Sequence, residues 1–163
     1  MAVTIRNMTA EEFEAFFRWS VEQNVQELME QLHLSEEEAT RETLRELEQM
    51  LPDGLRTPHN HLMTVLDAGG ESAGFIWMLY EEFEGRKQCF ICDFAVWEPK
   101  RRKGYAAAAL QLAEQHAAKA GCEECVLFVR DDNTPARSLY EKCGYRVLRQ
   151  KDYGKFMIKK IER

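Results

Sequence analysis

The sequence predicts an α/β protein (α+β in its mixed sheet) with one twisted, mostly antiparallel central sheet and helices on both of its faces. Segments of strand and helix character follow one another in the order β-α-α-β-β-β-α-β-α-β-β. Short turns join the early strands, which predicts antiparallel hairpins, and helices join the later ones, which predicts two crossovers. The 163 residues, 45% of them hydrophobic, can bury one core, so we expect a single domain over residues 1–163.

The first half of the chain is predicted to contain a short strand, two helices and then three strands. Each helix begins at a capping box, in which Ser or Thr is followed three residues later by Glu. The two boxes pair Thr9 with Glu12 and Ser35 with Glu38. Apolar residues recur at helical spacing behind each box, and Pro52-Asp53-Gly54 ends the second helix. The expected strands cover residues 3–7, 61–66, 74–80 and 89–97, with a loop at 55–61 and turns at 67–70 and 84–85.

The second half is predicted to alternate helices with strands. A basic loop, Lys100–Lys103, leads into a helix over residues 104–120, which Gly121 ends. Asn133 is the expected N-cap of the next helix, with Pro135 in its first turn. That helix ends at Gly144, and the remaining strands are expected at residues 126–129, 145–149 and 156–161, the last two joined by a turn at 152–154.

The charge of the chain is unevenly distributed along it. Residues 1–97 carry 7 Lys and Arg against 19 Asp and Glu, whereas residues 98–163 carry 15 against 9, and the formal charge is −6. An acidic protein lacks the basic face that phosphate backbones require, so we expect no general nucleic-acid binding. No stretch approaches the roughly 20 apolar residues of a membrane span, and the first residues lack a secretory leader, so we expect a cytoplasmic protein without membrane association.

Five cysteines include two Cys-x-x-Cys pairs, Cys89 with Cys92 and Cys122 with Cys125, beside Cys143. Four thiolates in tight turns would form a structural zinc site. The first pair lies in an apolar strand, where residues three apart point to opposite faces and cannot converge on one ion. We therefore expect free, packed thiols and no metal, with a zinc or thiol-redox protein as the alternative that elemental analysis would test.

The stretch from Val96 to Ala106 has the composition of an anion-binding loop. It joins a buried strand to the start of a helix, where the first amide groups lack intrahelical acceptors and the helix dipole adds positive charge. Gly104 allows close approach to the backbone, four alanines at 106–109 keep the first turns thin, and the basic residues 100–103 supply charge. The pattern is neither Walker A nor Gly-x-Gly-x-x-Gly. A solvated basic turn that only caps the helix is the alternative to a pyrophosphate site.

Two motifs resemble those of the GNAT N-acetyltransferase superfamily. Arg101-x-x-Gly104-x-Ala106 after a strand resembles its acetyl-CoA signature, and Asn133-x-x-Ala136-x-x-Leu139-Tyr140-x-x-x-Gly144-Tyr145 resembles its later motif. The order of elements fits the same fold from residue 3 to residue 161, and the segment from Leu51 to His61 resembles a bacterial subgroup whose substrate is not established. The resemblance implies a GNAT-like acyl-CoA N-acyltransferase fold, acetyl-CoA as cosubstrate and, as in many proteins of this fold, a homodimer.

The resemblance also implies cosubstrate contacts for residues of both motifs. Backbone groups of Phe94 and Val96 would hold the pantetheine arm, in a slot opened where the next parallel strand, residues 126–129, diverges. Asn133 would contact the cosubstrate near the pantetheine, and Arg137 could reach a phosphate. The pyrophosphate would lie on the loop of Arg101, Arg102, Lys103, Gly104, Tyr105 and Ala106.

Two residues are expected to carry the chemistry. Tyr140 resembles the family tyrosine near the thioester sulfur, where its phenol can protonate the departing thiolate; ordinary core packing is the alternative. Asp93 interrupts an apolar strand, and a buried carboxylate with a raised pKa suits a base, although it could equally be a structural hydrogen-bond acceptor. Further candidates for the base are Glu81, Glu82, His59 and His61, and some related enzymes use no side-chain base.

The predicted activity is transfer of an acetyl group from acetyl-CoA to a primary amine by direct transfer in a ternary complex. A non-catalytic acyl-CoA-binding regulatory protein is the alternative, and it predicts no release of thiol. The acidic first part of the chain favours a cationic acceptor, either a small amine or an amine of a peptide or protein, through electrostatic steering.

Overall fold

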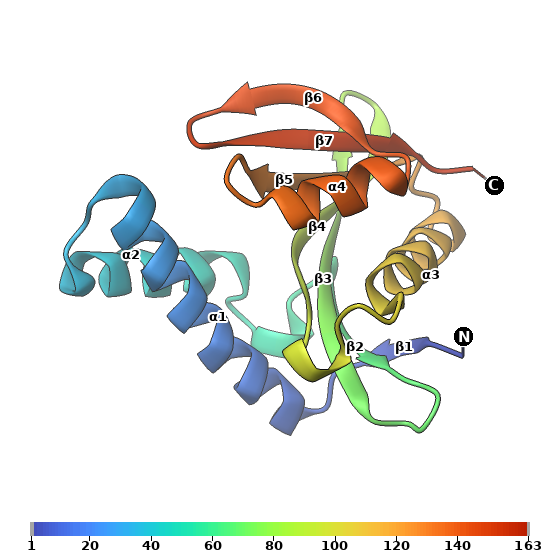
Figure 1. The fold of residues 1–163 in the computed structure, drawn as a ribbon, viewed down its shortest axis with the longest axis horizontal. Coiled ribbons are helices and arrows are strands. Elements are labelled where there is room, and N and C mark those ends of the chain that lie inside the picture. The colour runs from blue at the N-terminus through green and yellow to red at the C-terminus, as the bar shows by residue number, and fades with distance from the viewer. Residues whose placement is uncertain (1, 163) are drawn as a thin grey trace. The chain divides into compact units, whose positions relative to one another are not determined.

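The computed structural model describes residues 2–162, and its elements follow the predicted order (Figure 1). The strands are β1 (Thr4–Asn7), β2 (Asn60–Leu66), β3 (Ser72–Phe83), β4 (Arg86–Val96), β5 (Glu124–Arg130), β6 (Arg146–Lys151) and β7 (Gly154–Lys160). The helices are α1 (Ala10–Leu32), α2 (Glu36–Met50), α3 (Tyr105–Lys119) and α4 (Thr134–Lys142), with short 3-10 turns η1 (Gly54–Arg56) and η2 (Glu98–Lys100). The chain divides into two compact units, residues 8–60 with α1 and α2, and the remainder with the sheet, α3 and α4.

All seven strands form one sheet in the order β1-β2-β3-β4-β5-β7-β6. β4 and β5 run parallel, whereas the pairs β1–β2, β3–β4, β5–β7 and β6–β7 are antiparallel. The predicted mixed, mostly antiparallel sheet is therefore confirmed. The crossover through α3 joins β4 to β5, which are neighbours in the sheet. The crossover through α4 joins β5 to β6, which are not neighbours, because β7 lies between them. The order of elements along the chain does not reveal this insertion.

α3 and α4 pack on the same face of the sheet. Both contribute to one core cluster with alternate residues of β3, such as Ile76 and Met78, which a strand projects to one side. Ala113 of α3 is fully buried, and its small side chain lets the helix lie close to the strands. Three cysteines are fully buried in this cluster: Cys89, Cys122 and Cys125. The predicted packing of thiols is confirmed for these three.

The unit of residues 8–60 is a helical hairpin in which α1 and α2 contact each other. Both predicted capping boxes are formed. The Thr9 hydroxyl accepts the Glu12 N–H at 3.1 Å, and the Thr9 N–H donates to the Glu12 carboxylate at 2.9 Å. Ser35 and Glu38 make the same pair of bonds, so both helices begin where the sequence predicts.

Thr43 of α2 is buried, and its hydroxyl has no hydrogen-bond partner within residues 2–162. A buried polar group without a partner costs free energy. We therefore expect Thr43→Val to raise the free energy of unfolding, measured by urea titration, by about 1 kcal/mol. Thr57→Val is the matched control: its hydroxyl donates to Gly54 at 2.8 Å and accepts from Asp53 at 3.1 Å, so its loss should lower the same free energy by about 1–2 kcal/mol. Equal shifts in the two variants would contradict this assignment.

Candidate functional site

β4 and β5 are parallel neighbours that separate toward their carboxyl ends. Their register runs from Gln88 opposite Glu124 to Ile91 opposite Leu127. β4 continues beyond this stretch to Val96, while β5 stays paired with β7 along its whole length. Each of the two strands leads into a helix, β4 into α3 and β5 into α4 (Figure 1). Because the strands are parallel, both helices begin at the same edge of the sheet, where ligands of such folds bind.

A β-bulge in β4 lies at the level of this separation. Trp77 of β3 is opposite Asp93, and the next residue of β3 is opposite Ile91, so Cys92 is an extra residue in β4. An extra residue reverses the alternation of side chains along a strand. Ile91 and Phe94 therefore both pack in the core cluster with α3 and α4, although they are three residues apart.

The anion loop, which we define as residues 97–104, leads from β4 to α3 as predicted. Its backbone enters the left-handed region twice, at Arg102 with φ 65° and at Gly104 with φ 82°. Turns of this kind direct successive amide groups into one concave anion site. Gly104 is the N-cap of α3, and helix geometry leaves the amide groups of residues 105–107 without intrahelical acceptors. These amides can bind an anion.

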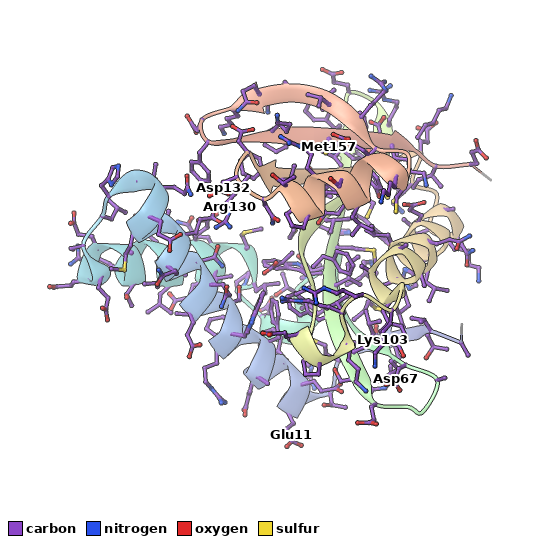
Figure 2. All side chains as sticks on the ribbon, in the orientation of Figure 1. Glu11, Asp67, Lys103, Arg130, Asp132 and Met157 are labelled. Carbon is purple, nitrogen blue, oxygen red and sulfur yellow. The ribbon has the colours of Figure 1, made fainter. Side chains whose placement is uncertain are left out.

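Three of the four basic residues of the loop are exposed: Arg101, Arg102 and Lys103. Figure 2 places Lys103 just before the start of α3. Arg101 Nε donates to the Val96 carbonyl at 2.9 Å, so part of this side chain is folded back along the end of β4. The exposed guanidinium and ammonium groups give the loop a positive charge beside its amides, as an anion site requires.

Lys100 behaves differently from the other basic residues, and the sequence did not predict its role. Its ammonium group donates to Oδ2 of Asp67 at 2.7 Å. The hydrogen bond to Lys100 lowers the pKa of Asp67, and the same bond raises the pKa of Lys100. The pair joins the anion loop to the turn between β2 and β3.

Tyr140 and Asp93, the two predicted catalytic residues, lie near each other. Burial, together with the nearby Asp93 and Cys143 groups, raises the pKa of Tyr140 to about 12. The Tyr140 ring packs edge-on against Tyr145, with centroids 6.0 Å apart. Asp93 is half-buried, less than expected, and its Oδ1 accepts the N–H of Phe94 at 2.9 Å. Tyr140 is therefore a neutral phenol at physiological pH, with a carboxyl group close to it.

Asn133 and Arg137, which are predicted to contact the cosubstrate, both interact with residues of α4. Asn133 caps α4, because its side-chain oxygen accepts the Ala136 N–H at 3.3 Å. Arg137 Nε lies 4.0 Å from the Glu141 carboxylate, one helical turn on. Asn133 therefore stands at the start of α4, at the edge of the sheet where α3 also begins.

The other candidates for the base occupy different surroundings. Glu81 and Glu82 are exposed on β3. His59 has φ 67° and lies in the loop before β2. His61 lies on β2, and its ring packs against the ring of Tyr80 on β3, with centroids 4.1 Å apart. Among the candidates for the base, Asp93 is the one whose charge acts on the Tyr140 phenol.

His116 of α3, which belongs to no motif in the sequence, is linked to the same sheet. Its Nδ1 lies 2.6 Å from the Tyr80 hydroxyl, and its ring contacts His61 edge-on at 5.4 Å between centroids. Burial, aided by the positive charge of Lys119, lowers the pKa of His116. A histidine at this position is hard to distinguish by sequence, because the residue lies on an ordinary amphipathic helix.

The lowered pKa of His116 gives stability a predictable pH dependence. The unfolded chain, with a histidine pKa of about 6.5, takes up a proton before the folded protein does as the pH falls. The stabilising contribution is complete above about pH 6.5 and is lost as the pH falls through the folded pKa. We expect the free energy of unfolding to decrease between pH 7.5 and 5.5, and to decrease less in His116→Gln. Equal slopes in urea titrations of the two proteins would contradict this expectation.

Within residues 2–162, no group of three or more His, Cys, Asp or Glu side chains is placed to hold a metal ion. In a regular strand, residues three apart point to opposite faces, but the bulge interrupts this alternation between Cys89 and Cys92. Cys89 is buried in the core and Cys92 is half-buried. Burial, with Asp93 and Glu81 nearby, raises the pKa of the Cys92 thiol.

No helix in the described part of the chain is long and apolar enough to cross a membrane.

Comparison with known protein families matches residues 13–145 to the acetyltransferase (GNAT) family. The chain belongs to this family. The match includes the anion loop and the segment from Asn133 to Tyr145, which carried the resemblance in the sequence. Membership confirms the predicted enzyme class, an N-acetyltransferase, with acetyl-CoA as its cosubstrate.

Bacillus subtilis (strain 168) contains two similar proteins, the uncharacterized N-acetyltransferases YdgE and YycN. YdgE is 33% identical over 145 residues, which cover 89% of this chain and 92% of YdgE. YycN is 31% identical, and its crystal structure, that of a putative acetyltransferase, superposes with a TM-score of 0.83 over 92% of this chain and 98% of YycN. The PaiA N-acetyltransferase of Thermoplasma acidophilum, crystallised with coenzyme A, shares the fold with a TM-score of 0.72 at 22% identity, over 98% of this chain and 99% of PaiA.

Proposed function

We propose that this acetyltransferase moves the acetyl group of acetyl-CoA directly to a primary amine, in a ternary complex of enzyme and both substrates. The observation that carries the proposal is the separation of the parallel strands β4 and β5, each of which leads to a helix start at one edge of the sheet. We take residues 1–163 to act as one catalytic domain, because the family match crosses both compact units.

In this proposal the anion loop binds the pyrophosphate of acetyl-CoA. The amide groups from Arg101 to Ala106 surround it, and the exposed side chains of Arg102 and Lys103 neutralise its charge. The pantetheine arm lies beside Phe94 and Val96, where β5 no longer pairs with β4. Asn133 and Arg137 approach the cosubstrate from the first turns of α4. The positive φ values of the loop and the charge of its side chains support this placement.

In the proposed reaction Tyr140 acts as the acid in one proton transfer and Asp93 acts as the base in the other. The reacting nitrogen first loses its ammonium proton to solvent. The free amine then attacks the thioester carbonyl carbon, and a C–N bond forms as the C–S bond breaks with its electron pair on sulfur. Tyr140 gives its phenolic proton to that sulfur, and Asp93, directly or through one water, takes the proton that the amine loses. The products are an amide and the free thiol of CoA, and exchange with solvent returns the proton from Asp93 to Tyr140.

We propose a cationic amine as the acceptor, because of where the negative charge lies. Residues 8–60 contain 13 Asp and Glu against 4 Lys and Arg. A surface of this sign raises the local concentration of a cationic substrate and repels an anionic one.

Release of free thiol from acetyl-CoA, measured across a panel of amines, tests the proposal. The panel pairs polyamines and lysine peptides with matched acidic amines, and mass spectrometry of the product checks the acetyl transfer. We expect thiol release with a cationic amine and intersecting initial-rate patterns, as a ternary complex requires. CoA binding without thiol release for any amine would indicate the non-catalytic acyl-CoA binder instead, and a preference for acidic amines would overturn the proposed acceptor.

A further inference from the structure

The anion loop is joined to a turn far from it in the sequence. The turn between β2 and β3 carries Asp67, whose Oδ2 accepts the Lys100 ammonium at 2.7 Å (Figure 2 labels Asp67). A second bond joins the same two segments, because the Trp97 indole N–H donates to the Ser72 hydroxyl at 3.0 Å. The Trp97 amide also donates to the Ala73 carbonyl at 2.9 Å. The first half of the loop is therefore held by the β2–β3 turn and by the first residues of β3.

Asp67 is itself fixed in place by that turn. Its Oδ1 accepts the N–H of Gly69 at 2.9 Å and the N–H of Glu71 at 3.0 Å. Its side chain is 8% exposed, whereas that of Glu71, which lies 3.8 Å from the same ammonium group, is 77% exposed. The carboxylate thus accepts three hydrogen bonds from three different groups, and its second oxygen presents a fixed position to Lys100.

Lys100 occupies the last position of η2, directly before the strained part of the loop. Its amide donates to the Trp97 carbonyl at 2.8 Å, so the side-chain ion pair and the backbone turn fix the same residue. Two residues later Arg102 adopts φ 65°, a region that is costly for any residue except glycine. Contacts that hold the preceding residue are needed to offset that cost and keep the amides directed at one point.

We propose that Asp67 is a positioning residue for acetyl-CoA: through its ion pair with Lys100 it holds the anion loop in the conformation that binds the pyrophosphate. The inference rests on the proposed binding of acetyl-CoA at this loop. Lys100, which is 22% exposed and paired, acts on the loop and does not contact the phosphates.

The sign of the effect separates positioning from simple electrostatics. Asp67 is a negative charge near an anion site, so Coulomb's law alone predicts that its neutralisation strengthens the binding of CoA. The positioning role predicts the opposite, because the freed Lys100 no longer holds the loop. Asp67→Asn is a suitable change, since its amide oxygen can still accept the two N–H groups of the turn while its charge is lost.

The test measures CoA affinity by isothermal titration calorimetry and steady-state kinetics for the wild type, Asp67→Asn, Lys100→Met and the double variant. We expect each single variant to raise the Kd of CoA and the KM of acetyl-CoA about fivefold to tenfold, with kcat changed less than about twofold. The double variant should match the single ones, because both break the same ion pair. Amide hydrogen exchange at residues 101–104 should be faster in the variants. Glu71→Gln, which removes an adjacent exposed charge, is the control and should leave the Kd unchanged.

Two results with the variants would overturn the positioning role. Unchanged or tighter CoA binding by Asp67→Asn, with normal binding by the wild type, contradicts the positioning role. Weaker binding by Lys100→Met alone would instead make Lys100 a direct phosphate ligand. If the wild type itself fails to bind CoA, the proposed function is wrong and this role falls with it. Should Asp67→Asn fold poorly, Lys100→Met and the exchange rates of the loop still decide between these outcomes.

Discussion

Tyr140→Phe is expected to lower kcat about tenfold to a hundredfold while leaving the Kd of CoA unchanged. The substitution removes one hydroxyl and keeps the aromatic ring that packs against Tyr145 at 6.0 Å between centroids. The hydroxyl is expected to act only when negative charge develops on the sulfur, so its loss affects the transition state and not the bound ground state.

The pKa of Tyr140 explains why the expected loss of kcat in Tyr140→Phe is large but does not exceed about a hundredfold. At about 12 it keeps the phenol protonated throughout the neutral range, so the donor is always present. A free thiol has a pKa of about 8.5, so proton transfer to a relaxed thiolate in water would be unfavourable. In a closed site the thiolate is desolvated as well, which raises its own pKa and makes the transfer less costly. We therefore propose that Tyr140 donates to the sulfur as the C–S bond breaks, and that the desolvated thiolate then takes up the proton.

Tyr145→Phe is the matched control for this prediction. Its hydroxyl donates to the buried carboxylate of Glu114 at 3.0 Å, and Lys159 also donates to Glu114, at 2.7 Å. We expect its loss to lower the free energy of unfolding by about 1–2 kcal/mol and to leave kcat near the wild-type value. Equal turnover in Tyr140→Phe and the wild type would remove Tyr140 from the mechanism.

Gly74→Ala should be the most destabilising of the substitutions considered, with a loss of about 3 kcal/mol or more in the free energy of unfolding. Gly74 is opposite Val96 in the β3–β4 register. A methyl group there would overlap the Ala95 carbonyl oxygen and lie 2.9 Å from the Val96 Cα. Both are backbone atoms of a paired strand, so neither can move aside without disturbing the end of β4. Because the anion loop begins at that end, we also expect weaker CoA binding.

Gly69→Ala, in the neighbouring turn, provides the control. Its new methyl group would meet only the Asp67 Oδ1, at an ordinary contact distance of 3.5 Å. We expect a change within about 0.5 kcal/mol in urea titrations. If the two alanine variants unfold with the same free energy, the close approach of β3 and β4 at Gly74 is not what requires glycine.

The sequence was sufficient to predict most of the fold because its local signals agree with one another. Both capping boxes are formed, and the loop from residue 97 to residue 104 joins a strand to a helix as expected. The position of β7 between β5 and β6 was not predictable, because it depends on pairing between segments that carry no local signal for it.

Features of the candidate site that depend on contacts across the sheet were also missed. The bulge at Cys92 contains no Gly or Pro, so nothing in the sequence distinguishes it from a regular strand. In the sequence Lys100 looks equivalent to the other three basic residues of the segment 100–103. Only the structure distinguishes it, through its contact with Asp67, 33 positions away. Tyr140, by contrast, was proposed from its position in a motif and Asp93 from its charge within an apolar strand, and the structure brings them near each other.

A crystal structure of this protein with CoA tests the central claim most directly. We expect the pyrophosphate within hydrogen-bond distance of the amides of residues 101–106, and the pantetheine arm between β4 and β5 beyond Ile91 and Leu127. The sulfur should then lie close to the Tyr140 hydroxyl. CoA bound away from the anion loop, or with its sulfur remote from Tyr140, would contradict the account.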